Sequence, residues 1–247
     1  MSSAPAVAPN PETAPLVSCE STGFRNAEAR DGGWHRYLRI FHRLAPPLAV
    51  FLLQLAFFAP LSLRRLIDSD EGFYLYISRL VVTKGVVLYR DVFYQQMPLL
   101  PYVYGGWMRG FGFTWDSGRM LSAALAALIG VLLFSAVQRA TRNILLAAAS
   151  VFLYALNLSV LLFFLTTKTY VLSTFFLFVS MLFAASERDR FRFAMSGLFL
   201  AFSIQTRLFF AVAAPVFAFF LWRREKGNFL PALKRFSAGL ILGFLPS

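Results

Sequence analysis

Long apolar runs alternate with short polar or basic segments along most of this chain. About 20 apolar residues in a helix cover the hydrocarbon core of a bilayer. Runs that approach this length extend over 44–63, 122–137, 144–165 and 170–185. We expect the second run to be extended by the turn that begins at Gly118, and the pair Pro46–Pro47 to form the entry or first turn of the first run. The pattern predicts an all-α polytopic membrane protein.

The run 194–222 is too long for one ordinary spanning helix and short for two, and Arg207 interrupts it near its middle. A charge at the bilayer centre costs at least about 2.5 kcal/mol. We therefore predict two short spans that meet at residues 205–207. A last apolar segment, 236–246, has about half the length of a span, so we expect the sequence to be a fragment or a prematurely ended reading frame.

The polar segments differ in charge in a way that predicts the orientation of the chain. The net charge is +12, but the basic residues sit mainly at the ends of apolar runs, which favours a topology signal over nucleic-acid binding. Residues 36–43, 139–142, 188–192 and 223–235 would face the cytoplasm together with the N-terminus, while the short outer turns carry only Lys168 and Arg207. Residues 1–33 predict a disordered tail. It holds the single cysteine, Cys19, so an internal disulfide or cysteine metal site is excluded.

The longest water-facing segment, residues 64–117, is the predicted external loop of the domain 34–247. Its part 72–82 repeats apolar residues on one helical face but is too short to span, which indicates a helix at the membrane interface. An irregular aromatic connection follows from Tyr89. Pro98 and Pro101 then open a second short helix that ends near Gly110. These two helices either brace the bundle or carry a site.

The acidic group Asp68, Asp70 and Glu71 opens this loop and admits three interpretations. Asp68 and Glu71 have the spacing of a helix cap. Asp68 and Asp70 could offer oxygen ligands to a divalent metal, although two such residues are a weak signal. A carboxylate could also act as the general base that accepts a proton from a hydroxyl.

The order of motifs resembles the polytopic glycosyltransferases of the GT-C class. The closest likeness is to the dolichyl-phosphate-mannose protein mannosyltransferase-like and RgtA/B/C/D-like families, over about residues 40–247, the N-terminal part of such enzymes. The matching segments are 70–74, Gly85, 88–94, 98–102, 118–121 and 205–207. The resemblance implies a GT-C-like transmembrane bundle with a long first external loop that contains interfacial helices.

The resemblance also implies an activity and roles for residues. A sugar would pass with inversion from a polyprenyl-phosphate donor to a hydroxyl of a lipid, glycan or protein acceptor, on the outer face of a bacterial inner membrane. Asp70 would be the catalytic base, and Glu71 would orient it or the acceptor. The candidates for binding the donor phosphate are Arg79, Lys84, Arg90, Lys168 and Arg207. Tyr74, Tyr89, Asp91 and Tyr94 would belong to a substrate loop.

Two departures from the family pattern affect this expectation. Many relatives carry a second acidic residue where the third span emerges, whereas residues 166–170 here are Thr-Thr-Lys-Thr-Tyr. We also expect the family's C-terminal part, which helps to shape the acceptor site, to be absent from this sequence, so the chain as given can be inactive. A multi-span transporter without bond chemistry is the alternative, with a purely structural role third. An enzyme requires Asp70 and Arg207 to converge on one cavity at the outer face, whereas a transporter would place Arg207 along an internal route.

Overall fold

The computed structural model describes residues 25–187 and 191–245 of the 247-residue chain, with side chains described from residue 44 onward. The described secondary structure is helical, apart from one isolated bridge between Leu88 and Val92. The chain divides into two compact units, Met1–Leu44 and Ala45–Ser247. All contacts discussed below lie within the second unit.

The helices follow one another with short connections. In chain order they are α1 (Arg25–Leu63), α2 (Ser69–Lys84), α3 (Leu99–Phe111), α4 (Trp115–Thr141), α5 (Ile144–Leu156), the π-helical turn η1 (Val160–Phe164), α6 (Thr169–Ala185), α7 (Arg192–Thr206), the 3₁₀ segment η2 (Leu208–Val212), α8 (Ala213–Arg224) and α9 (Phe229–Phe244). Two of them are long and apolar enough to cross a membrane, Leu44–Leu63 within α1 and Trp115–Thr141, while α5 and α6 are apolar but shorter.

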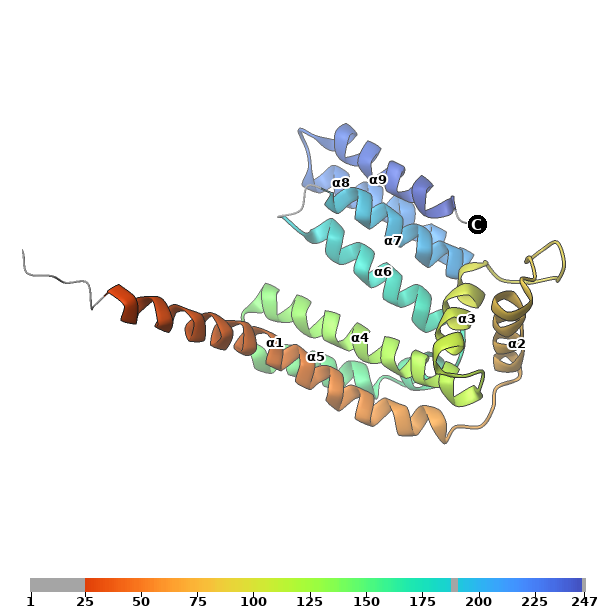
Figure 1. Ribbon diagram of the computed structural model, residues 1–247. Helices are drawn as coiled ribbons and strands as arrows, with labels where there is room; N and C mark the ends of the chain where they lie inside the picture. Colours follow the sequence, from red (N-terminus) through yellow and green to blue (C-terminus); the bar gives the residue numbers. More distant parts are fainter. Residues whose placement is uncertain (1–24, 188–190, 246–247) are drawn as a thin grey trace, which may run out of the picture. The chain divides into compact units, whose positions relative to one another are not determined.

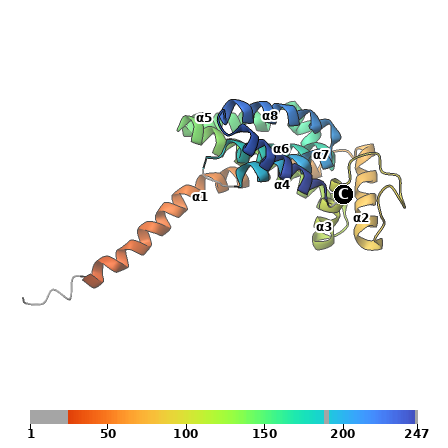
Figure 2. The same ribbon diagram turned by 90° about the horizontal axis from the view of Figure 1, so that it is seen from above.

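Within the second unit, α7 packs between α6 and α9, α4 packs against α5 and α6, and α2 packs against α3. Both views place α2 and α3 side by side at one end of the longer helices (Figures 1 and 2). The main core cluster joins this pair to the bundle, because Tyr74 and Ile77 of α2 and Tyr104 of α3 share it with Leu125 of α4. The short pair α2–α3 is therefore anchored by its buried faces.

Several predicted elements are confirmed. A helix is present over the predicted segment 72–82, within α2, and the helix opened by Pro98 and Pro101 is α3. The predicted interruption at Arg207 is also present, because this residue has extended backbone (φ −152°, ψ 113°) between α7 and η2. A short polar interruption in a long apolar run thus marked a true helix end.

Other expectations need correction. The run 144–165 is two segments, because Asn157 ends α5 in an extended conformation (φ −64°, ψ 125°) before η1 begins. Pro46 and Pro47 lie inside α1 and do not begin it. Since α1 begins at Arg25, the last part of the predicted disordered tail is helical, and residues 1–24 lie outside the described residues.

Candidate active site

The start of α2 carries a complete capping box made by Asp68 and Glu71. The Asp68 carboxylate accepts a hydrogen bond from the Asp70 amide at 3.2 Å, and the Asp68 amide donates to Glu71 Oε2 at 3.2 Å. These contacts satisfy backbone N–H groups that the first turn of a helix leaves unpaired. The capping interpretation therefore holds for Asp68 and Glu71.

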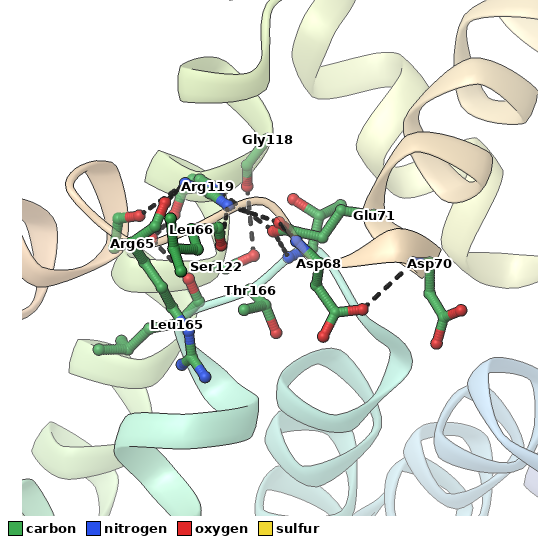
Figure 3. A network of polar contacts seen from close by, with 12 residues as sticks. Arg65, Leu66, Asp68, Asp70, Glu71, Gly118, Arg119, Ser122, Leu165 and Thr166 are labelled. Carbon is green, nitrogen blue, oxygen red and sulfur yellow. Dashed lines mark hydrogen bonds and ion pairs between the residues drawn. The ribbon is translucent and has the colours of Figure 1, made fainter.

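Glu71 also forms a buried ion pair with Arg119 at the start of α4 (Figure 3). Arg119 Nη2 lies 2.6 Å from Glu71 Oε2, and Arg119 Nε lies 3.2 Å from Oε1. The Glu71 side chain is 0% exposed and that of Arg119 3%. Glu71 Oε1 accepts a further hydrogen bond from the Thr167 amide at 2.8 Å. A buried charge is tolerated when it is paired and hydrogen-bonded in this way.

Arg119 extends this network to the end of α1. Its guanidinium donates to the backbone carbonyls of Ser62 at 3.1 Å, Arg65 at 2.8 Å and Leu66 at 3.1 Å. These carbonyls belong to a helix terminus and the turn after it, where acceptors lack helical partners. Arg119 and Glu71 together hold the end of α1, the starts of α2 and α4, and the segment before α6. We interpret Glu71 as a positioning residue, since its oxygens already serve the fold.

Asp70 differs from both acidic neighbours because its carboxylate is 59% exposed. Lys168 lies between the two aspartates, with Nζ 2.9 Å from Asp68 Oδ1 and 3.4 Å from Asp70 Oδ2. The hydrogen bond from Lys168 lowers the pKa of Asp68 against an opposing effect of burial. Burial acts to lower the pKa of Lys168, but the two aspartates outweigh it and raise that pKa. Lys168 is therefore a stable cation beside the exposed Asp70 carboxylate.

Arg207 contacts the two residues that follow Lys168 in the chain. Its guanidinium lies over the Tyr170 ring, 4.0 Å from the centroid, and Nη1 donates to Thr169 Oγ1 at 3.3 Å. Burial and the charge of Asp70 raise the pKa of Tyr74, while Lys168 and Arg207 act in the opposite direction. Asp70, Lys168 and Arg207 thus all act on the Tyr74 hydroxyl. We call Asp70, Tyr74, Lys168, Tyr170 and Arg207 the polar cluster.

The loop between α2 and α3 places the other predicted substrate residues. Asp91 forms an exposed ion pair with Arg90 at 2.8 Å and accepts a hydrogen bond from the Val87 amide at 2.9 Å. The bond from Arg90 lowers the pKa of Asp91 to about 2. Tyr94 is buried, whereas Tyr89 is exposed and has φ 66°. This backbone conformation is uncommon for a non-glycine residue and is typical of constrained loops.

Two of the predicted phosphate-binding residues lie away from the polar cluster. Lys84 is in the last turn of α2, about 21 Å along the helix from Asp70 at 1.5 Å per residue. Arg79 lies 5.8 Å from the centroid of the Phe113 ring and lines a separate cavity of about 170 Å³ beside Trp115. Of the five candidates, Lys168 forms an ion pair with Asp70, and Arg207 contacts Thr169 and Tyr170, the two residues that follow Lys168.

The same contacts bear on the metal interpretation. The described residues contain no group of three or more His, Cys, Asp or Glu side chains suited to hold a metal ion. Asp68 and Asp70 instead share the Lys168 ammonium, and Asp68 also caps α2. A divalent cation takes six or more ligands, and in a calcium site several of them come from the protein. Two carboxylates that already contact Lys168, one of which also caps α2, therefore fit such a cation poorly.

Sequence reasoning assigned no role to Arg119 or Tyr170. The available signal for Arg119 was a charged residue in the first turns of a long apolar run, which requires a partner inside the fold. Comparison with protein-family models, curated proteins and solved structures gives no match for this chain. Its function is therefore argued from the site itself.

Proposed function

We propose that this protein is an integral membrane glycosyltransferase that moves a sugar from a polyprenyl-phosphate donor to a hydroxyl acceptor. The observation that carries the proposal is the separation of tasks among the three acidic residues that open α2. Asp68 caps the helix and Glu71 pairs with Arg119, which leaves the exposed Asp70 carboxylate beside the Lys168 ammonium, with Arg207 on the two residues that follow Lys168. An exposed carboxylate whose ion pair with Lys168 involves only Oδ2 can accept a proton as a general base.

In the proposed reaction, each charged residue of the polar cluster has its own role. Asp70 accepts the proton of the acceptor hydroxyl while the hydroxyl oxygen attacks the anomeric carbon of the donor sugar. The bond from that carbon to the phosphate oxygen breaks, and its electron pair leaves with the lipid phosphate. Lys168 and Arg207 stabilise the negative charge on the departing phosphate, as preorganised cations do in phosphoryl sites. Attack from the face opposite the phosphate inverts the anomeric carbon.

The membrane part of the proposal is a polytopic bundle with Asp70 on the outer face. Two helices are long and apolar enough to span a membrane, and the arginines gather in the connections that are predicted to face the cytoplasm. This charge asymmetry supports a spanning arrangement. Arg207 supports an enzyme over a transporter, because it lies over Tyr170 in the polar cluster. A transporter route would instead place charged groups along the bundle interior.

The test is sugar transfer from polyprenyl-phosphate donors in membranes that contain the full-length protein. Asp70→Asn removes the base and keeps the size of the side chain. We expect it to lower the rate at least about 100-fold, since general base catalysis contributes that much or more. Asp116→Asn is the matched control, because Asp116 is an exposed acidic residue in the first turn of another helix, α4.

Both variants should insert into membranes as the parent does. Near-parental transfer by Asp70→Asn would contradict the proposal and leave Asp70 a surface residue. Failure of the parent with every donor tried would count against glycosyl transfer as the function.

A further inference from the structure

A second feature of the same end of the molecule is a cavity of about 570 Å³ under the loop between α2 and α3. Pockets that hold small molecules have volumes of this order. The residues that line it come mostly from this loop, with one from α3 and one from the segment after Arg207: Val87, Leu88, Tyr89, Tyr94, Gln95, Gln96, Met97, Pro98, Tyr102 and Leu208. We call it the aromatic pocket.

The walls of the aromatic pocket are braced by the loop's own hydrogen bonds. The Tyr89 amide donates to the Val92 carbonyl and the Asp91 amide to the Val87 carbonyl, each at 2.9 Å. The Tyr89 hydroxyl donates to the Gln96 carbonyl at 2.6 Å. Together with the Val87–Asp91 contact, these bonds fix a backbone that includes the left-handed Tyr89. The pocket is therefore formed before any ligand binds, which reduces the entropy lost on binding.

Tyr94 provides the observation that points to a ligand. Its side chain is 2% exposed, and its hydroxyl has no hydrogen-bond partner among the described residues. Its ring stacks on Phe73 at 5.8 Å and meets Tyr74 edge-on at 6.4 Å. Burial raises the pKa of Tyr94, so the hydroxyl stays protonated. Buried hydroxyls normally have a partner, so an unpaired hydroxyl on a residue that lines the pocket points to a bound molecule as its partner.

The lining defines the chemical class of that molecule. Among the described residues that line the pocket, none carries a charge, which disfavours a phosphate or an ionised peptide. Tyrosine rings offer flat apolar faces, and the amides of Gln95 and Gln96 offer both donors and acceptors. A sugar ring presents an apolar face and a rim of hydroxyl groups, so it complements both features.

The aromatic pocket lies next to the polar cluster. Leu208, which lines the pocket, directly follows Arg207, and Tyr94 contacts Tyr74, whose hydroxyl feels the charges of Asp70, Lys168 and Arg207. The pocket and the polar cluster are therefore neighbours, joined at Tyr74 and Arg207. A phosphate would be held at the cations of the polar cluster, outside the uncharged pocket.

We propose that the aromatic pocket binds an uncharged glycan, which is the acceptor of the transfer, an identification that rests on the proposed function. The glycan packs its apolar ring face against a tyrosine, and one of its hydroxyl oxygens accepts a hydrogen bond from Tyr94. The sequence left three classes of acceptor open, namely lipid, glycan and protein. The pocket selects a neutral glycan among them.

The test is binding of neutral saccharides to the purified full-length protein in nanodiscs, free of glycoside detergents. The probes are the methyl glycosides and neutral disaccharides of glucose, galactose and mannose, detected by saturation-transfer NMR. We expect at least one probe to bind, and Tyr94→Phe to weaken it at least about fivefold. Tyr76→Phe is the matched control, since Tyr76 is an exposed tyrosine of α2 outside the pocket lining.

Thermal stability separates loss of binding from loss of folding. Removing a buried hydroxyl that makes no hydrogen bond is close to neutral, so Tyr94→Phe should melt at or above the parental temperature. Unchanged affinity in Tyr94→Phe, or no binding of any probe to the parent, would overturn the proposal. Saccharide binding without transfer activity would sustain the pocket and reject the proposed function. Transfer that requires Asp70 but is unchanged in Tyr94→Phe would support the proposed function and reject the role of the pocket.

Discussion

At the scale of single residues, the arrangement of the site depends on the pair Glu71 and Arg119. Their charges are buried together, and each also bonds to backbone groups of other segments. Buried ion pairs are a weak source of net stability, but removing one partner leaves an uncompensated charge. The pair is therefore best understood as a device that fixes geometry. It sets the position of α2, and with it the direction in which Asp70 faces.

Arg119→Met should destabilise the protein by about 3–5 kcal/mol, because Glu71 remains buried without its counter-charge. Glu71→Gln should also destabilise it, because Arg119 is then the buried charge without a counter-charge, and a single amide oxygen remains to accept from the Thr167 amide and from Arg119. The measurement is denaturant or thermal unfolding in detergent. Arg109→Met is the control, because Arg109 is exposed in the last turn of α3 and should change stability by no more than about 0.5 kcal/mol. Equal stability of the Arg119 and Arg109 variants would contradict the assigned role.

The sequence indicated where the candidate site lies, but it could not show which acidic residue faces the core and which faces outward. Asp70 and Glu71 are adjacent, and successive helical residues point about 100° apart, so one could face inward and the other outward. The capping spacing of Asp68 and Glu71 was visible locally. The partner of Glu71 was not, because Arg119 is 48 residues away and only the packing of α4 against the loop brings it near.

At the scale of elements, the predictions succeeded where the chain carries strong local signals. Arg207 marked a helix end because a charge within an apolar run is costly. The break at Asn157 lacks a charge, Pro or Gly, and it depends on the Asn157 side chain accepting from the Ser159 amide at 2.9 Å. The fixed φ of proline is compatible with a helix, and Pro46 and Pro47 lie within α1. Prolines are tolerated in apolar helices when neighbouring groups bond to the backbone carbonyls that lose their partners.

The contact between α2 and α3 depends on a glycine whose neighbour in sequence supplies a matched control. A Cβ on Gly105 would lie 2.6 Å from the Ser78 carbonyl oxygen and 2.7 Å from a methyl group of Val82, whereas a Cβ on Gly106 would meet nothing within 4 Å. Gly105 therefore allows close approach of the two helices, and Gly106 has no such task.

Gly105→Ala should destabilise the protein by about 1–3 kcal/mol, because backbone must move to admit the methyl group. Gly106→Ala should stabilise it by about 0.5–1 kcal/mol through its higher helix propensity. Melting temperatures of the two variants in one detergent compare them directly. If both alanines raised the melting temperature, the close packing of α2 on α3 would not hold in solution.

At the scale of the whole molecule, the described contacts separate two ends of the bundle in the second unit. Lys168 precedes α6 and touches Asp68 and Asp70, while Arg224 donates to the carbonyls of Ala184 and Ser186 at the other end of α6. The 17 residues of α6 separate these ends by about 25 Å. The polar cluster and the arginine-rich connections thus lie at opposite ends, as an orientation with Asp70 outside requires.

This orientation can be tested with cysteine labelling, because Cys19 is the single cysteine of the chain. A membrane-impermeant maleimide applied to right-side-out vesicles should leave Cys19 unlabelled until the vesicles are lysed. In a Cys19→Ser background, Lys84→Cys should label at once, since it lies at the exposed end of α2. Arg139→Cys, exposed in the last turn of α4, should require lysis. If the Lys84 and Arg139 positions label together in intact vesicles, α4 does not cross the membrane, and an outer-face active site at Asp70 loses its main support.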